Sequence, residues 1–193
     1  MKTVVLASAS PRRKEILERA RIPFIVDAGD YEEDMSLDLP PHELVRHFSL
    51  GKAQSVQHKH PNSLVIGSDS VVVFDGKILG KPHTPQRAKE MLQKLSGRKN
   101  TAVTGYAVID TDNGNMFVDS VENVVTFRKI SDHEIDAYIA TGEPFDKAGA
   151  YAIQGVGGLF VEKIEGDYTA ILGLPLWPVV RTLKEFGFEP FQI

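Results

Sequence analysis

Residues 3–26 read TVVLASASPRRKEILERARIPFIV, and three elements can be recognised in them. The apolar run Val4–Ala7 predicts a short buried strand. Ser10 followed by Pro11 is typical of a helix start, because serine favours the N-cap and proline is tolerated at the first helical position. The apolar residues 24–26 predict a second strand. A strand, a helix and a strand in this order indicate an α/β protein.

Helical and hairpin patterns interleave along the rest of the chain. The first helix is expected to continue to about residue 21, and further helices to begin near residues 41, 84, 131 and 175. Strands are expected at 64–66, 71–74, 77–79, 101–110 and 116–128, and a hairpin at 159–161 and 168–171. Residues 67–70, Gly-Ser-Asp-Ser, are expected to interrupt the strand pattern. The prediction is a mixed rather than purely parallel β-sheet with flanking helices.

Composition limits the class of protein. The 193 residues fit one domain spanning 1–193, although two lobes within it remain an alternative. The absence of cysteine excludes disulfides and thiolate catalysis. A net charge of −4 argues against a nonspecific nucleic-acid binder. The apolar runs are too short to span a bilayer, and the first residues do not resemble a secretory signal, so we expect a cytoplasmic protein that binds no membrane.

The first predicted helix begins with an unusual cluster of cations. Arg12, Arg13 and Lys14 follow Ser10 directly, at the helix end that already carries partial positive charge. A bound polyanion would offset this cost, since backbone N–H groups, two guanidinium groups and the hydroxyl of Ser8 could converge on phosphate oxygens. The alternative is that these side chains extend into solvent.

Two lysines and one aspartate add to a possible phosphate site. Lys81 lies between a glycine and a proline, and Lys52 follows Gly51 in a predicted helix. Each could be an ordinary solvated lysine, but together with the arginines they could neutralise a triphosphate. Asp69 follows an apolar strand and a glycine, so we expect it at a strand end, where α/β proteins bind ligands. A turn aspartate that caps its own backbone is the alternative.

Two other segments contribute one candidate each. Residues 27–34 form an acidic loop, and the simplest interpretation is that its charges are solvated. One of its carboxylates could instead bind a Mg²⁺ ion, and Glu33 is our candidate. Residues 146–155 are rich in small side chains and include Gln154. An amide both donates and accepts hydrogen bonds, as reading a base edge requires. Tight packing of a turn would explain this segment equally well.

Six motifs, in this order, resemble the Maf (septum formation inhibitor) family of nucleotide pyrophosphatases. They are Ser8–Arg13, Gly67–Ser70, Gly80–Pro82, Leu95–Gly97, Asp146–Tyr151 and Gly173–Pro175. The resemblance implies an enzyme that uses Mg²⁺ or Mn²⁺ to hydrolyse nucleoside triphosphates to monophosphate and pyrophosphate. It also implies a mixed α/β fold with two lobes around a central cleft, similar to inosine triphosphatases.

The resemblance also implies roles for individual residues. Asp69 matches the catalytic proton acceptor and, with Glu33, the metal site. The positions that hold phosphates are Arg12, Arg13, Lys52 and Lys81, and those linked to substrate choice are Arg12, Ser70 and Gln154.

The expected substrates are dTTP and UTP, because the segment around Gln154 is similar to the branch of the family that acts on them. Ser70 stands where this branch usually has threonine, and Ser68 where it has alanine, which is closer to a sister branch acting on 7-methyl-GTP. Three alternatives remain: that sister activity, a noncatalytic nucleotide-binding regulator of cell division, and a phosphomonoesterase. The partners considered are the nucleotide and, in a homodimer, a second copy of the chain.

Overall fold

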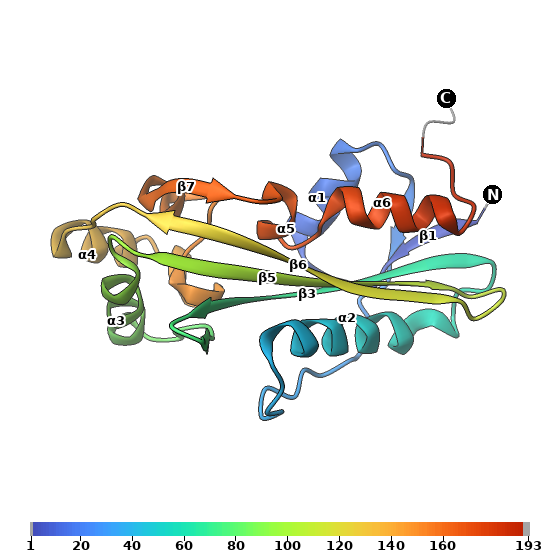
Figure 1. The fold of residues 1–193 in the computed structure, drawn as a ribbon, viewed down its shortest axis with the longest axis horizontal. Helices are drawn as coiled ribbons and strands as arrows, with labels where there is room; N and C mark the ends of the chain where they lie inside the picture. The colour runs from blue at the N-terminus through green and yellow to red at the C-terminus, as the bar shows by residue number, and fades with distance from the viewer. Residues whose placement is uncertain (1, 191–193) are drawn as a thin grey trace. The chain divides into compact units, whose positions relative to one another are not determined.

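A seven-stranded mixed sheet forms the centre of the computed structural model, which describes residues 2–190 (Figure 1). The strands are β1 (Thr3–Leu6), β2 (Phe24–Val26), β3 (Ser63–Phe74), β4 (Lys77–Leu79), β5 (Lys99–Asp110), β6 (Met116–Phe127) and β7 (Val161–Glu165). The helices are α1 (Pro11–Arg19), α2 (Pro41–Gln57), α3 (Pro85–Leu95), α4 (Asp132–Ala140), α5 (Tyr168–Ile171) and α6 (Leu176–Glu185). Three 3₁₀ turns, Glu143–Asp146, Ala148–Ala150 and Val156–Phe160, precede β7.

The strand order is β2-β1-β3-β5-β6-β7, with β4 paired to β3. Strand β1 runs parallel to β2 and to β3, with Val5 opposite Ile25 and Val65. The pairs β3–β4 and β6–β7 are antiparallel. The turn between β3 and β4 is Asp75-Gly76, and both residues have positive φ, as the predicted tight hairpin requires. The mixed sheet with flanking helices expected from the sequence is therefore confirmed.

The chain divides into two compact units. The first contains the residues up to Ser70, Thr104–Val121 and the residues from Leu172 onward; the second contains Val71–Val103 and Glu122–Ile171. The boundaries fall inside β3, β5 and β6, so each of these strands contributes residues to both units. The expected two lobes thus have a counterpart in the structure, and the expected cleft stays a prediction.

In the first unit, helices cover both faces of the sheet. Helix α2 lies on one face and helices α1 and α6 on the other (Figure 1). Strand and α2 side chains form a buried apolar cluster of Val5, Ala7, Ala53, Val56, Val65, Ala107 and Ile109. None of the helices in residues 2–190 is long and apolar enough to cross a membrane.

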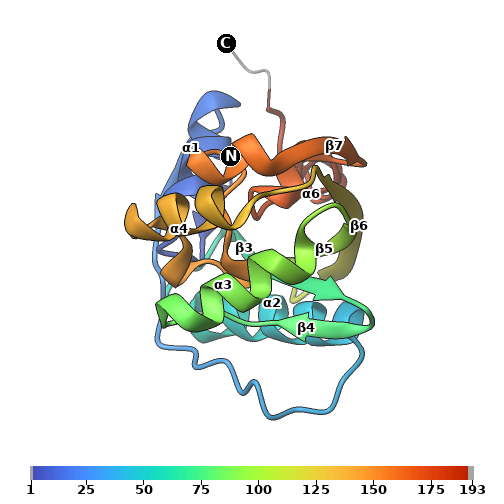
Figure 2. The same ribbon diagram turned by 90° about the vertical axis from the view of Figure 1, so that its left-hand side faces the viewer.

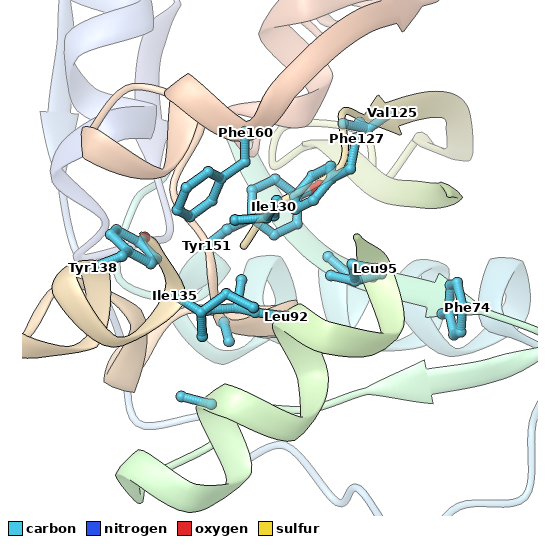
Figure 3. Close-up of a cluster of buried hydrophobic side chains, with 13 residues drawn as sticks. Phe74, Leu92, Leu95, Val125, Phe127, Ile130, Ile135, Tyr138, Tyr151 and Phe160 are labelled. Atoms are coloured by element: carbon cyan, nitrogen blue, oxygen red, sulfur yellow. The ribbon is translucent and has the colours of Figure 1, made fainter. Parts of the chain in front are cut away.

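The second unit has its own aromatic core, which packs against α3 and α4 (Figures 2 and 3). The ring of Phe127 meets Tyr151 edge to face at 4.8 Å between centroids, and Tyr138 meets Phe160 in the same way at 5.1 Å. Helix α4 begins at the predicted capping box, in which the Ser131 and Glu134 side chains each bond the other's backbone N–H.

Two expectations of local structure were wrong. Strand β3 continues through residues 67–70 without a break, so Asp69 lies inside the strand and not, as expected, at its end; the polar side chains of this stretch find partners inside the fold. The hairpin expected at 159–161 and 168–171 does not form: residues 156–160 are a 3₁₀ turn, β7 begins only at Val161 and pairs with β6, and 168–171 is a short helix. Asp167 causes this, since its Oδ1 accepts hydrogen bonds from the N–H groups of Thr169 and Ala170 and so caps the helix.

Candidate active site

Two strand glycines allow helix α2 to approach the sheet closely. A Cβ atom added at Gly67 would lie 2.0 Å from the carbonyl oxygen of Ser49, and one at Gly105 would lie 2.4 Å from another α2 carbonyl oxygen. Both distances are far inside van der Waals contact, so only glycine fits on β3 and β5 here. The approach places Lys52, one turn beyond Ser49, over Asp69, which shares its face of β3 with Gly67.

Lys52 bridges two carboxylates in the first unit. Its Nζ lies 2.6 Å from Oδ1 of Asp69 and 2.6 Å from Oε1 of Glu33. The Asp69 side chain is 9% exposed and that of Glu33 is 40% exposed. Since both oxygens contact one nitrogen, they can be no farther apart than twice that distance. The structure thus brings together three residues that are distant in the sequence and were selected from it.

The surroundings of Asp69 make it a stronger base than an exposed aspartate. Burial raises the pKa of Asp69, the positive charge of Lys52 opposes the rise, and the negative charge of Glu33 adds to it. A desolvated carboxylate beside a second carboxylate holds a proton more readily. This environment suits a group that accepts a proton during a reaction.

Arg13 is a half-buried cation at the start of α1. Its Nε donates a hydrogen bond to the carbonyl oxygen of Gly173 at 2.9 Å, and its Nη1 donates to Oγ of Ser8 at 2.9 Å. Burial lowers the pKa of Arg13, while the charges of Asp69 and Glu33 oppose this effect. Because a guanidinium group stays protonated in proteins, Arg13 is a fixed positive charge close to both acids.

Helix α1 starts where the sequence predicts, while the third cation, Lys14, is exposed and pairs with Glu18. Ser10 is the N-cap residue, and its N–H donates to Oγ of Ser8 at 3.2 Å. The first turn of α1 contains no acidic residue. Burial is the main cause of the lowered pKa of Arg13, and the positive charge of Arg12 lowers it further. The two cations therefore lie within Coulomb range of each other. Their contact with phosphate stays a prediction.

Ser68 and Ser70 lie on the face of β3 opposite Asp69. Oγ of Ser68 is fully buried, 2.7 Å from the carbonyl oxygen of Gly105 and 2.8 Å from that of Gly173. Oγ of Ser70 lies 2.9 Å from Oγ1 of Thr104 on β5. Ser68 therefore acts within the fold, whereas Ser70 is half-buried beside a second hydroxyl.

The acidic segment before α2 uses its carboxylates in different ways. Oδ2 of Asp27 lies 2.8 Å from Nε2 of His60, and Oδ1 of Asp34 accepts hydrogen bonds from the backbone and hydroxyl of Ser36. Glu33, selected from the sequence, reaches the ammonium group described above.

Lys81 and Gln154 belong to the second unit, and their approach to the other candidates stays a prediction. Lys81 is exposed just after β4. The N–H of Gly149 donates to the carbonyl oxygen of Gly80 at 3.2 Å, so the motif that contains Lys81 contacts the segment 146–151. Gln154 is exposed in a turn.

A carboxylate that the sequence analysis did not identify holds the turn around Gln154. Glu143 accepts hydrogen bonds from the hydroxyl of Tyr138 at 2.8 Å and from the N–H groups of Val156 and Gly157, each at 3.0 Å. A Cβ atom at Gly155 would lie 2.2 Å from the Glu143 carboxylate. The glycines of this segment are the sequence feature that could have indicated Glu143, since glycine allows another group to approach the backbone closely.

Two carboxylates that converge on one cation form a donor set suited to Mg²⁺ or Mn²⁺. Mg²⁺ is commonly held by one or two carboxylates and completes its shell with phosphate oxygens and water. Asp69 and Glu33 meet this requirement as hard oxygen donors. Within residues 2–190, no group of three or more His, Asp or Glu side chains could hold a metal. A metal here would therefore need ligands from the substrate or from water.

A family model for Maf-like proteins matches residues 3–186. The chain belongs to the Maf-like protein family. Two relatives of this Maf-family chain are named dTTP/UTP pyrophosphatase. The protein from Bacillus cereus (strain ATCC 10987) is 44% identical over 98% of this chain and 92% of its own length. The protein from Bacillus cytotoxicus is 46% identical over 96% of each chain.

A solved structure of a nucleoside-triphosphatase / dITP/XTP pyrophosphatase from Mycobacterium abscessus also matches this Maf-family chain. It covers 66% of this chain and 75% of its own, with 17% identity and a TM-score of 0.42.

Proposed function

We propose that this chain is a nucleoside triphosphate pyrophosphatase that hydrolyses dTTP and UTP to the monophosphate and pyrophosphate. Membership of the Maf-like family and relatives named dTTP/UTP pyrophosphatase at 44% and 46% identity support the reaction and the substrates. The observation that carries the proposal is the buried Asp69, a carboxylate with a raised pKa that faces Lys52 and lies near Arg13. A base beside fixed cations is what hydrolysis of a phosphoanhydride needs.

Asp69 is the proton acceptor in the proposed reaction. Its carboxylate takes a proton from a water molecule while the water oxygen forms a bond to the α-phosphorus. The bond between the α-phosphorus and the oxygen that bridges to the β-phosphorus breaks, and that oxygen leaves with pyrophosphate. The products are a nucleoside monophosphate, pyrophosphate and a proton held on Asp69.

The cations of the site bind the triphosphate and stabilise the charge that develops on the leaving group. Arg13 is suited to this role because its two hydrogen bonds fix the guanidinium group before substrate arrives. We assign phosphate contacts also to Ser8, Arg12, Lys52 and Lys81. A divalent cation, Mg²⁺ or Mn²⁺, held by Asp69 and Glu33 would supply further positive charge at the phosphate oxygens.

Arg12, Ser70 and Gln154 are assigned to the choice of nucleotide. The full burial of Ser68 means that this serine gives no reason to prefer 7-methyl-GTP over the pyrimidine substrates. Its hydroxyl lies within hydrogen-bond distance of two carbonyl oxygens inside the first unit. The difference from the usual alanine therefore concerns packing and not contact with a base. Ser70 keeps the hydroxyl of the usual threonine. The proposal places the enzyme in the cytoplasm, where nucleoside triphosphates are made.

The test is a panel of purified nucleotides. The protein is incubated with dTTP, UTP, CTP, ATP, GTP and 7-methyl-GTP, with Mg²⁺ or Mn²⁺ or with a chelator, and the phosphorus products are identified by ³¹P NMR. We expect pyrophosphate from dTTP and UTP, with loss of activity in the chelator. Orthophosphate as the product would indicate a phosphomonoesterase. Nucleotide binding without turnover would indicate a noncatalytic regulator.

A further inference from the structure

Residues 27–33, the first half of the connection between β2 and α2 in the first unit, contact α2 or the residues just after it through every second residue. Asp27 pairs with His60, just after the helix, at 2.8 Å. A Cβ atom added at Gly29 would lie 2.4 Å from Oγ of Ser55. The ring of Tyr31 contacts α2 at Gly51, and the carboxylate of Glu33 contacts it at Lys52, both nearer the start of the helix than Ser55. The contacts recur at every second residue although the segment is not a regular strand, since Gly29 has a φ of +64° and its N–H donates to Oδ1 of Asp27.

Tyr31 contacts α2 where the helix has no side chain. A Cβ atom added at Gly51 would lie 2.2 Å from Cε2 and 2.4 Å from Cζ of the Tyr31 ring. The ring also packs against Phe48, with 6.3 Å between centroids and a 60° angle between planes. Glycine is a poor helix former, so its presence inside α2 needs a reason. The tyrosine ring, which leaves no room for any other residue at position 51, supplies that reason.

The Tyr31–Gly51 contact lies next to the candidate active site. Tyr31 is two residues from Glu33, and Gly51 directly precedes Lys52, the residue that Glu33 contacts at 2.6 Å. Burial, followed by the charges of Glu33 and Asp69, raises the pKa of Tyr31, in agreement with a ring close to both acids. Residues 28–30 and 32–38 are all exposed, whereas Tyr31 is half-buried. The ring is therefore the main apolar attachment of this segment.

We propose that Tyr31 is a positioning residue: its ring occupies the space that Gly51 leaves on α2 and thereby holds Glu33 against Lys52. The effect on catalysis rests on the proposed pyrophosphatase function. The attachment itself does not, and it can be measured without substrate.

A double-mutant cycle tests the contact. Tyr31→Ala removes the ring, and Gly51→Ala leaves the ring but fills its space with a methyl group. The double variant has an alanine at both positions and no steric conflict. Gln54→Ala, at an exposed position of α2, is the matched control for adding alanine to this helix. Tyr31→Phe keeps the ring and removes only the hydroxyl. Thermal unfolding of each protein shows that it is folded.

The first readout is cleavage by a glutamate-specific protease after Glu32 or Glu33, in the absence of nucleotide. We expect Tyr31→Ala and Gly51→Ala each to be cleaved about tenfold faster than the wild type, as release of a held segment predicts. The double variant should be cleaved no faster than Tyr31→Ala alone, and Tyr31→Phe and Gln54→Ala should match the wild type. Wild-type cleavage of Gly51→Ala, or effects that multiply in the double variant, would overturn the proposal. So would a Tyr31→Phe protein that behaves like Tyr31→Ala.

The second readout is the kinetics of dTTP hydrolysis. Displacement of Glu33 should lower kcat/KM by about ten- to a hundredfold in both single variants, again with no further loss in the double variant. If the wild type hydrolyses no nucleoside triphosphate, the proposed function fails while the cleavage cycle still decides the role of Tyr31. If the wild type is active but the cycle shows no coupling, the positioning role fails alone.

Discussion

Arg13 and Ser68 share one acceptor, the carbonyl oxygen of Gly173, at 2.9 Å and 2.8 Å. Helix α1, strand β3 and the segment before α6 therefore meet at a single backbone group. Gly173 has a φ of +111°, and a Cβ atom there would lie 3.3 Å from Nε of Arg13. The orientation of the half-buried Arg13 thus depends on a glycine at position 173, because any other residue would be strained at this φ.

Ser68→Ala tests how much the stability of the protein depends on the hydrogen bond from Ser68 to the carbonyl oxygen of Gly173. We expect a loss of about 1 kcal/mol in the free energy of unfolding, because one buried hydrogen-bond donor is removed while Gly173 keeps its bond from Arg13. Denaturant unfolding measures it. Turnover should change little, and a loss of turnover as large as that of an Asp69 variant would show that Ser68 acts on the substrate.

Asp69→Asn tests the proton acceptor. We expect turnover to fall about 10²–10⁴-fold, because the amide cannot accept the proton. The protein should stay folded, since Lys52 keeps Glu33 as a partner and the amide has the shape of the carboxylate. Pyrophosphate release and thermal unfolding are measured on the same preparation. Wild-type turnover would refute the role of Asp69.

Glu33→Gln tests the proposed metal site. Mn²⁺ or Mg²⁺ should raise the melting temperature of the wild type, because a ligand that binds only the folded state stabilises it. This shift should be smaller in Glu33→Gln, which lacks one of two carboxylate donors, and should disappear in excess chelator. Equal shifts in both proteins would place the metal elsewhere. Glu32→Gln, one residue away and exposed, is the control.

Glu134→Gln tests the capping box of α4. Hydrogen bonds from Arg128 and then from Ser131 lower the pKa of Glu134 from 4.5 to about 2. The carboxylate therefore contributes stability above pH 4.5, and this contribution is lost as the pH falls towards about 2. Thermal unfolding across that window should show a shallower pH dependence in Glu134→Gln than in the wild type. Parallel curves would contradict the assignment.

Glu143→Ala tests the turn that contains Gln154. Three donors would lose their acceptor, so we expect the unfolding free energy to fall by about 2 kcal/mol. If Gln154 selects the base, the ratio of kcat/KM for UTP to that for CTP should fall in Glu143→Ala and in Gln154→Ala alike. A fall in Gln154→Ala alone would limit Glu143 to stability.

Sequence patterns that span a few residues predicted much of the fold. The hairpin at Asp75-Gly76 and the helix cap at Ser131 are examples, because each is determined by residues that are neighbours in the sequence. Such patterns failed at residues 67–70, where the partners of the polar side chains come from α2, β5 and the segment before α6. The same limit applies to the site. The charged residues and motifs of the sequence indicated Lys52, Asp69 and Glu33 one by one. Their mutual contact depends on the tertiary structure and could not be predicted. No local sequence pattern indicated Glu143.

The boundaries of the two units inside β3, β5 and β6 have a consequence for synthesis on the ribosome. The first unit needs residues from the start, the middle and the end of the chain, including the buried Leu174, Val179 and Leu183. Its core cannot close until these last residues have left the exit tunnel, so the first unit is expected to mature last and to be lost in a product truncated before Leu172.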